Sequence, residues 1–276
     1  MENINFLELL KIILIGIIEG ITEWLPVSST GHMLLFDAFL PLKASEAFKE
    51  MFFVVIQLGA ILAVVVIFRK KMIPFGIKEK LYVKKDILMM WVKVAVACIP
   101  SAVLGLIFDD TLEKYFGGAI SIAAMLIFYG IVFIVIESLS KNKTPKIEEI
   151  DGIGYKTAII IGLFQVLSMI PGTSRSGATI IGALILGVSR VAAAEFTFFL
   201  AIPTMLGASA LKLIKFGFDF SAAELLTLLL GSAVAFTVSI LAIRFLMSFV
   251  ARHDFKAFGY YRIILGIAVI IVFSII

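Results

Sequence analysis

Charged residues, cysteine and histidine are all scarce in this chain of 276 residues. Asp, Glu, Lys and Arg make up only 16% of it, against about 25% in a typical soluble domain. The single cysteine, Cys98, excludes an intramolecular disulfide, and the two histidines, His32 and His253, leave no Cys/His zinc spacing. The N-terminus has no basic segment and no evident signal cleavage pattern, so we expect its first apolar segment to stay in the mature protein.

Apolar residues are abundant instead, at 61% of the chain, and the mean hydropathy is +1.11. A soluble protein of this size could not hide that much apolar surface. The long apolar runs have helical length and no strand-like alternation, which predicts an all-α polytopic membrane protein. The net charge of +4 does not indicate a nucleic-acid partner, because the basic residues are spread over loops. The eight runs fall at about 6–25, 51–68, 87–108, 118–139, 157–171, 191–211, 222–250 and 258–276.

Two of the eight runs end in polar segments rich in proline, glycine and serine. The first ends in PVSSTGH at 26–32, and the fifth ends in PGTSRSG at 171–177. A shorter apolar piece follows each break, at 33–40 and 178–188. Proline and glycine stop a helix and serine can cap the next one, so we expect two re-entrant helical hairpins. The other six runs are predicted to be transmembrane helices.

The basic residues orient this arrangement in the membrane. With both termini outside, fourteen lysines and arginines fall in inside segments 69–85, 141–156 and 244–256. Six fall in outside segments 11–49, 114 and 212–215. The excess on the inside favours this orientation over its inverse, although charge alone also allows eight spans.

A weak internal repeat appears at an offset of 146 residues. Each unit, about 1–140 and about 150–276 of a single membrane domain, would hold one hairpin and three spans. An odd number of spans inverts the second unit, and inverted repeats place their broken helices at the repeat interface near the midplane. The two polar breaks should therefore meet in space. The matching pairs are Gly16/Gly162, Glu19/Gln165, Ser28/Ser174, Thr30/Ser176, Gly31/Gly177, Phe52/Phe198, Phe53/Phe199 and Ile56/Ile202.

Glu19 and Glu23 precede the first break and share one helix face. Each carboxylate costs about 2.5–3.5 kcal/mol in a membrane core by insertion scales. A pair of them at an interface, solvated or bonded to helix ends, is the plain structural alternative. A divalent-cation site is the functional interpretation, because Mg²⁺ usually takes one or two carboxylates together with substrate phosphate oxygens.

The first break itself offers a serine–histidine pair. Ser28 or Ser29 would cap the second hairpin helix, whose N-terminus favours a bound anion. Ser29 and His32, three residues apart, would face the same way and suit a nucleophile with an acid/base partner. Taken alone, this motif is better explained by capping serines beside an interfacial histidine, and only its neighbours favour the catalytic interpretation. Thr30 adds a hydroxyl that could bind substrate.

The second break supplies an anion cradle. Arg175 is the fork-shaped donor that suits phosphate oxygens, with a snorkelling interfacial arginine as the alternative. Ser174, Ser176 and Thr179 add hydroxyl donors. Gln57 is either a further substrate contact or a hydrogen bond between helices. Acidic metal ligands in one break and an anion cradle in the other together predict a phosphate site.

These motifs resemble those of the undecaprenyl-diphosphate phosphatase family, also called bacitracin-resistance proteins. Residues 19–23 (EGITE) match the family's (E/Q)xxxE motif and run into LPVSSTGH at 25–32. Residues 171–179 (PGTSRSGAT) match its PGxSRSxxT motif. The resemblance covers essentially the whole chain, with no departure at a functional position.

The resemblance implies hydrolysis of undecaprenyl diphosphate to undecaprenyl phosphate and phosphate, which recycles the lipid carrier for peptidoglycan synthesis and confers bacitracin resistance. It implies a Mg²⁺ or Ca²⁺ cofactor, a multi-pass place in the bacterial inner membrane and a site facing the periplasm. Membrane lipids are expected neighbours, bacitracin competes indirectly by binding the substrate, and a homodimer is left open. The family's essential residues correspond to Glu19, Glu23, Ser29, His32 and Arg175.

The mechanism and two rival functions stay open at this point. Either Ser29 or water attacks the terminal phosphorus with His32 as acid/base, or His32 is itself the nucleophile. A lipid flippase or transporter would share broken helices and inverted repeats, but transport does not need paired acids with a serine and a histidine. Membrane phosphatases of the phosphatidic-acid type 2 group would need a histidine at position 181, where this chain has Ile181.

Overall fold

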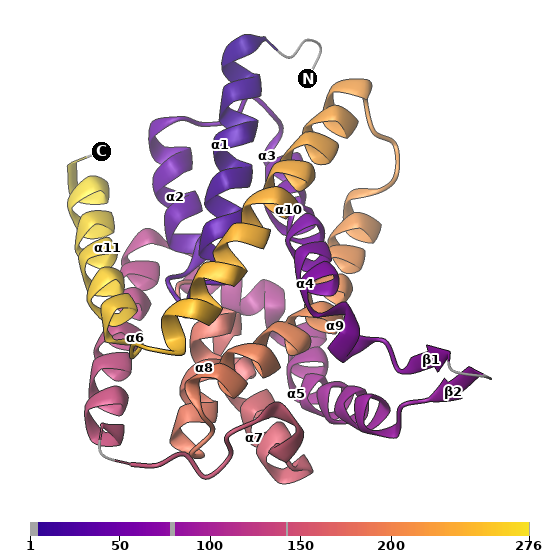
Figure 1. Ribbon diagram of the computed structural model, residues 1–276. Coiled ribbons are helices and arrows are strands. Elements are labelled where there is room, and N and C mark those ends of the chain that lie inside the picture. Colours follow the sequence, from indigo (N-terminus) through magenta and orange to yellow (C-terminus); the bar gives the residue numbers. More distant parts are fainter. Residues whose placement is uncertain (1–4, 78–80, 142, 276) are drawn as a thin grey trace.

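A computed structural model describes residues 5–77, 81–141 and 143–275 of the chain, and helices dominate it (Figure 1). Serine and asparagine side chains cap several helix starts, as Ser45 does for α3 and Ser221 with Glu224 does for α10. The helices are α1 (Phe6–Thr22), α2 (Ser29–Phe39), α3 (Glu46–Val55), α4 (Gln57–Met72), α5 (Lys85–Phe116), α6 (Ala119–Ser140), α7 (Tyr155–Val166), α8 (Arg175–Ile185), α9 (Arg190–Phe216), α10 (Ala222–Val250) and α11 (Lys256–Ile275), with 3-10 turns at Ile150–Gly152 and Leu167–Met169.

Six helices among the described residues are long and apolar enough to cross a membrane. They coincide with the six runs predicted to span, and α3 and α4 together form one of them, interrupted only at Ile56. The predicted polytopic all-α class is therefore confirmed for the membrane part of the chain. The candidate spans are Glu46–Met72, Lys85–Phe108, Ala119–Ser140, Arg190–Phe216, Ala222–Val250 and Lys256–Ile275.

One element was not expected from the sequence. A small antiparallel hairpin of β1 (Phe75–Ile77) and β2 (Leu81–Val83) lies between α4 and α5. Its two three-residue strands project from the helical body (Figure 1). Lys78 and Lys80, which enter the charge count for the inside loops, lie outside the described residues.

The two polar breaks separate pairs of short helices, as predicted. Figure 1 shows α1 and α2 in the upper half of the molecule and α7 and α8 in the lower half. Each break ends in a serine with a left-handed backbone, Ser28 at φ 73° and Ser174 at φ 71°. They are the only non-glycine residues with positive φ in the described part of the chain. The two breaks therefore share an unusual local geometry as well as a sequence pattern.

The order of elements is also the same in the two halves. A broken pair of short helices is followed by one long span and two further helices, first in α1–α6 and then in α7–α11. The packing is reciprocal, because α1 packs on α10 and α7 packs on α5. The inverted topology, the re-entrance of the hairpins and the repeat bounds of about 1–140 and 150–276 stay predictions, since no bilayer is present.

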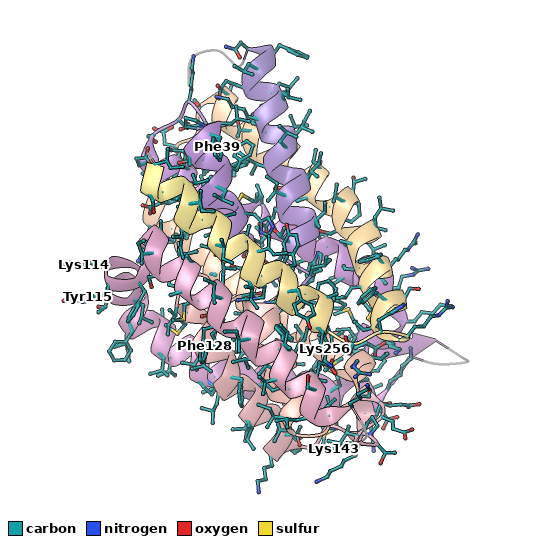
Figure 2. The ribbon with its side chains drawn as sticks, turned by 90° about the vertical axis from the view of Figure 1, so that its left-hand side faces the viewer. Phe39, Lys114, Tyr115, Phe128, Lys143 and Lys256 are labelled. Atoms are coloured by element: carbon teal, nitrogen blue, oxygen red, sulfur yellow. The ribbon has the colours of Figure 1, made fainter. Side chains whose placement is uncertain are left out.

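The two chain termini lie at the end of the molecule opposite to the loop after α6 (Figure 1 and Figure 2). The start of α1 and the end of α11 both lie toward the upper end in Figure 1. Figure 2 shows Phe39, at the end of α2, toward that end and Lys143 at the opposite one. Lys143 belongs to the loop segment 141–156, which the charge bias predicts to be inside.

The α6–α11 pair shares an extensive contact that depends on two glycines. A Cβ on Gly130 would lie 2.7 Å from the Gly259 carbonyl oxygen, and one on Gly259 would lie 2.8 Å from that of Gly130. The backbones therefore approach as closely as small residues permit. Helix α11 also carries Arg262, which contacts both breaks, so the packing of α6 on α11 helps to position the site.

Replacing Gly130 with valine should lower the thermal stability of the protein in detergent. The new side chain would have to displace backbone, and overpacking of this kind costs about 1–3 kcal/mol or more. A Cβ added to Gly207, on α9, would meet nothing within 4 Å, so Gly207→Ala is the matched control and should leave the unfolding temperature unchanged or higher. Equal stability of the two variants would contradict the close approach of α6 and α11.

Candidate active site

Glu23 is the centre of the contacts between the two breaks. One carboxylate oxygen, Oε1, accepts from Arg175 Nη2 at 3.0 Å, and Oε2 accepts from Ser29 Oγ at 3.0 Å. The backbone carbonyl of Glu23 accepts from Ser176 Oγ at 3.2 Å. Glu23, just before the first break, thus contacts Ser29 in that break and two residues of the second break, 152 and 153 positions away.

Arg175 is held on three sides. Besides Glu23, its Nη1 donates to the carbonyl oxygen of Thr197 on α9 at 2.8 Å. Its guanidinium carbon lies 5.8 Å from the ring centroid of Trp24, a cation–π geometry. Only 11% of the side chain is exposed, and Nε has no partner. The position is that of an interior cation with a donor left over, which excludes the snorkelling alternative.

Glu19 lies one helical turn before Glu23 and is buried, at 1% exposure. Its Oε1 has no hydrogen-bond partner, and its charge interacts with those of Glu23 and Arg175. A buried carboxylate oxygen without a partner is costly unless a cation or water satisfies it. Two carboxylates beside hydroxyl groups fit Mg²⁺ or Ca²⁺ when phosphate oxygens complete the shell. No set of three or more His, Cys, Asp or Glu side chains suited to a metal occurs among the described residues.

The first-break hydroxyls differ in their surroundings. Ser28 is buried, and its Oγ has no partner, so it caps nothing in α2. Ser29, partly exposed, starts α2 and points its hydroxyl at Glu23. Thr30 is exposed, and no hydrogen bond of its side chain occurs among the described residues. Ser28 and Ser29 therefore belong to the site by geometry, whereas Thr30 lies at its edge.

The expected contact between Ser29 and His32 does not form. His32 Nδ1 lies 2.8 Å from the Ser28 carbonyl oxygen and so must carry the proton of that hydrogen bond. Its Nε2 lies 2.8 Å from the Tyr261 hydroxyl, and the two rings stack with centroids 5.6 Å apart. The hydrogen bond to the carbonyl four residues back, together with the Tyr261 contact, occupies both ring nitrogens and leaves none for Ser29.

The hydroxyl groups of the second break have different partners: some bond to residues at the breaks, and one bonds to the buried core. Ser176 Oγ lies 3.2 Å from Ser174 Oγ and reaches the carbonyls of Glu23 and Leu25. Ser174 caps α8 by accepting from the Gly177 N–H. Thr179 is fully buried and bonds to backbone carbonyls and to Thr197 Oγ1 at 2.9 Å. Thr179 thus ties α8 to α9, which makes it a support for Arg175 rather than a free donor.

Gln57, the remaining predicted contact, begins α4 directly after the break at Ile56. It is half-buried and forms no side-chain hydrogen bond with the described residues. The site also contains residues that the sequence motifs do not indicate, namely Trp24, Thr197 and Tyr261. Arg262 on α11 also belongs with them. A lone arginine inside an apolar run was the available signal, because such residues are functional candidates by default.

This constellation suits the chemistry of a phosphate ester or anhydride. It combines a hydroxyl bonded to a carboxylate, a buried arginine with a free donor, and a second buried carboxylate. The starts of α2 and α8 both lie at the site, and helix starts favour anions. Nucleophile, base and cationic clamp are the parts that phosphoryl transfer needs.

Comparison with known proteins shows the family to which the chain belongs. A family model described as bacitracin resistance protein BacA matches residues 12–268. The chain belongs to this family. A relative from Enterococcus faecalis named undecaprenyl-diphosphatase is 65% identical over 274 residues, 99% of each chain. Relatives of the same name from Desulfitobacterium hafniense and Acetivibrio thermocellus are 58% identical (97% of this chain, 96% of theirs) and 56% identical (97% and 98%).

Membership of the BacA family confirms the resemblance drawn from the two motifs. Together with the six apolar helices, it identifies a multi-pass membrane protein. The matched range of 12–268 contains both breaks and Arg262 on α11. The family match therefore covers every residue of the candidate site.

Breaking the Glu23–Arg175 pair should destabilise this BacA-family protein strongly. Glu23→Ala or Arg175→Ala would each leave the other charge buried and unpaired, at a cost of about 3–5 kcal/mol. The double variant should lose much less stability than the two single variants do in sum, because no unpaired buried charge remains. Unfolding of all four proteins in the same detergent measures the coupling energy.

The control for this cycle is the exposed pair Lys212 and Glu50, whose charged atoms lie 3.7 Å apart with side chains 28% and 70% exposed. Its coupling should be about 0–1 kcal/mol. A coupling for Glu23 and Arg175 no larger than that of the control would mean that the two breaks are not joined by this pair.

Proposed function

We propose that this chain hydrolyses undecaprenyl diphosphate to undecaprenyl phosphate and inorganic phosphate, recycling a lipid carrier of cell-wall synthesis. The observation that carries the proposal is the meeting of Ser29, Glu23 and Arg175 in a chain 65% identical, over 99% of its length, to a protein named undecaprenyl-diphosphatase. Resistance to bacitracin follows from faster removal of the diphosphate that the antibiotic binds, so bacitracin would compete for substrate rather than for the enzyme.

In the proposed reaction, Ser29 Oγ attacks the terminal phosphorus, and Glu23 Oε2 accepts the hydroxyl proton. The phosphorus–oxygen bond to the bridging oxygen breaks, and undecaprenyl phosphate leaves with the electron pair. Water then releases phosphate from Ser29. We assign the base to Glu23 rather than His32 because Ser29 Oγ lies 3.0 Å from Glu23, while both nitrogens of His32 contact other groups. Direct attack by water, or attack by His32, would leave no phosphate on Ser29.

The other predicted residues support this step through charge and position. Arg175 would neutralise phosphate oxygens, with Ser28, Ser174 and Ser176 close to the same anion. A divalent cation, Mg²⁺ or Ca²⁺, held by Glu19 and Glu23 would neutralise the diphosphate further. Gln57 and Thr30 stay candidate substrate contacts at the edge of the site. His32 would act in proton transfer only through Nε2, the nitrogen that contacts Tyr261.

We further propose that the protein lies in the bacterial plasma membrane with the site open to the outer face, where the carrier diphosphate is released. The inside excess of basic residues supports this orientation. Membrane lipids would surround the exposed apolar faces, and a homodimer would have to form through those same faces.

Purified protein should release phosphate from undecaprenyl diphosphate, and a chelator should abolish the release until Mg²⁺ or Ca²⁺ is restored. Glu19→Gln should raise the metal concentration for half-maximal activity by about tenfold or more, since one of two carboxylate ligands is lost. Glu50→Gln, on an exposed carboxylate of α3, is the control and should behave as the original protein. Phosphate release that persists in Arg175→Ala would rule out the proposed site.

The orientation can be tested with single cysteines in a Cys98→Ala background. In intact cells, Lys114→Cys in the last turn of α5 should react with a membrane-impermeant thiol reagent. Lys143→Cys, after α6, should react only after lysis. The positive-inside bias is the physical reason. Labelling with the opposite pattern would place the site on the cytoplasmic face.

A further inference from the structure

Arg262 on α11 is fully buried, at 0% exposure, and has no carboxylate within ion-pair distance among the described residues. Its guanidinium donates to three backbone carbonyls instead. Nη1 donates to Pro26 at 3.2 Å, and Nη2 donates to Gly172 and Thr173, both at 2.8 Å. Its guanidinium carbon also lies 5.8 Å from the ring centroid of Tyr129 on α6. One buried cation from a third element thus bonds to both breaks at once.

Such a group is costly to bury, since a charged side chain away from water needs compensating partners. The compensation for Arg262 comes largely from the loop backbone at the two breaks. If its role were only to join helices, an apolar side chain of similar size would do so without desolvating a charge. The three hydrogen bonds of Arg262 are therefore better explained by their effect on the backbone conformation of the two breaks.

The three carbonyls lie one or two residues before the two serines with positive φ. Thr173 precedes Ser174 (φ 71°), and Pro26 lies two residues before Ser28 (φ 73°). A non-glycine residue with positive φ is strained and persists only where the surrounding structure holds it in place. Arg262 makes the same kind of contact at the same place in both breaks, so it supplies that constraint to both.

The constraint also determines where the backbone N–H groups point. In a trans peptide the C=O and the following N–H point in opposite directions. Turning the Thr173 carbonyl to Arg262 therefore turns the Ser174 N–H away from it, and this N–H has no acceptor among the described residues. Helices α2 and α8 begin at the next residues, Ser29 and Arg175. By fixing the backbone of both breaks, Arg262 therefore orients the first turns of α2 and α8, where Ser29 and Arg175 lie.

We propose that Arg262 is a positioning residue for phosphate hydrolysis, holding both left-handed serines so that the starts of α2 and α8 converge on one phosphate group. The inference rests on the proposed function and deepens it. Arg262 touches no substrate in this scheme; it acts through the backbone of both breaks. Its two-nitrogen fork is required, because one nitrogen must serve Pro26 while the other serves Gly172 and Thr173.

The test compares Arg262→Gln and Arg262→Lys in phosphate release and in inhibition by orthovanadate, a mimic of phosphate in its transition state. Arg262→Gln should lower kcat by about 100-fold, the effect of losing one preorganised donor set, with little change in KM. The inhibition constant for orthovanadate should rise in parallel. Arg262→Lys keeps the charge but lacks the two-nitrogen fork, so its kcat should lie between those of the unaltered protein and Arg262→Gln.

Arg190→Gln is the matched control at the other end of the molecule, where Arg190 bonds to buried Glu137 at 2.9 and 2.6 Å. It should lose thermal stability, yet its folded fraction should keep kcat and orthovanadate inhibition. Ser174→Gly supplies a second readout, because glycine adopts positive φ without steric cost. The loss of kcat caused by Arg262→Lys should be smaller in the Ser174→Gly variant than in the unaltered protein.

The outcomes separate the two proposals. If the unaltered protein releases no phosphate, the proposed function fails. If it does, and Arg262→Gln keeps its kcat and orthovanadate inhibition, the positioning role fails. A fall in kcat without weaker orthovanadate inhibition, or an equal loss for Arg262→Lys with and without Ser174→Gly, would make Arg262 a general packing residue and overturn the inference.

Discussion

The functional site depends on one ion pair buried inside an apolar protein. Glu23 and Arg175, 152 positions apart, meet as a buried ion pair at the facing breaks of two helix pairs. Neither charge would be stable alone at that depth, since an unpaired buried charge costs several kcal/mol. Folding therefore has to join the two breaks, and the same joining brings Ser29, Ser176 and Glu19 into one site.

The scaffold around this pair makes the meeting of the breaks accurate. Reciprocal packing of α1 on α10 and of α7 on α5 positions the two helix pairs. The close contact of α6 with α11 through Gly130 and Gly259 then brings Arg262 against both breaks. The glycine contact and the buried arginine act together. The packing of α6 on α11 positions Arg262, and Arg262 in turn orients the peptide groups of the two breaks.

The site leaves several polar atoms without partners, including Glu19 Oε1, Ser28 Oγ and Arg175 Nε. Buried polar groups in proteins are nearly always paired. Three such atoms in one small region support the proposal that a diphosphate and a divalent cation bind here, because each would supply missing partners.

Much of this protein was determined by sequence alone. Composition and the length of the apolar runs predicted six spans, because a helix must be about 20 apolar residues long to cross a bilayer. Proline, glycine and serine predicted both breaks, and the motifs within them predicted the family. The partners of individual side chains could not be predicted this way. Ser29 bonds to Glu23 rather than His32, Thr179 turns inward, and Arg262 bonds to carbonyls instead of a carboxylate. Those pairings depend on rotamers and on contacts between helices far apart in the chain, and only the tertiary structure decides them.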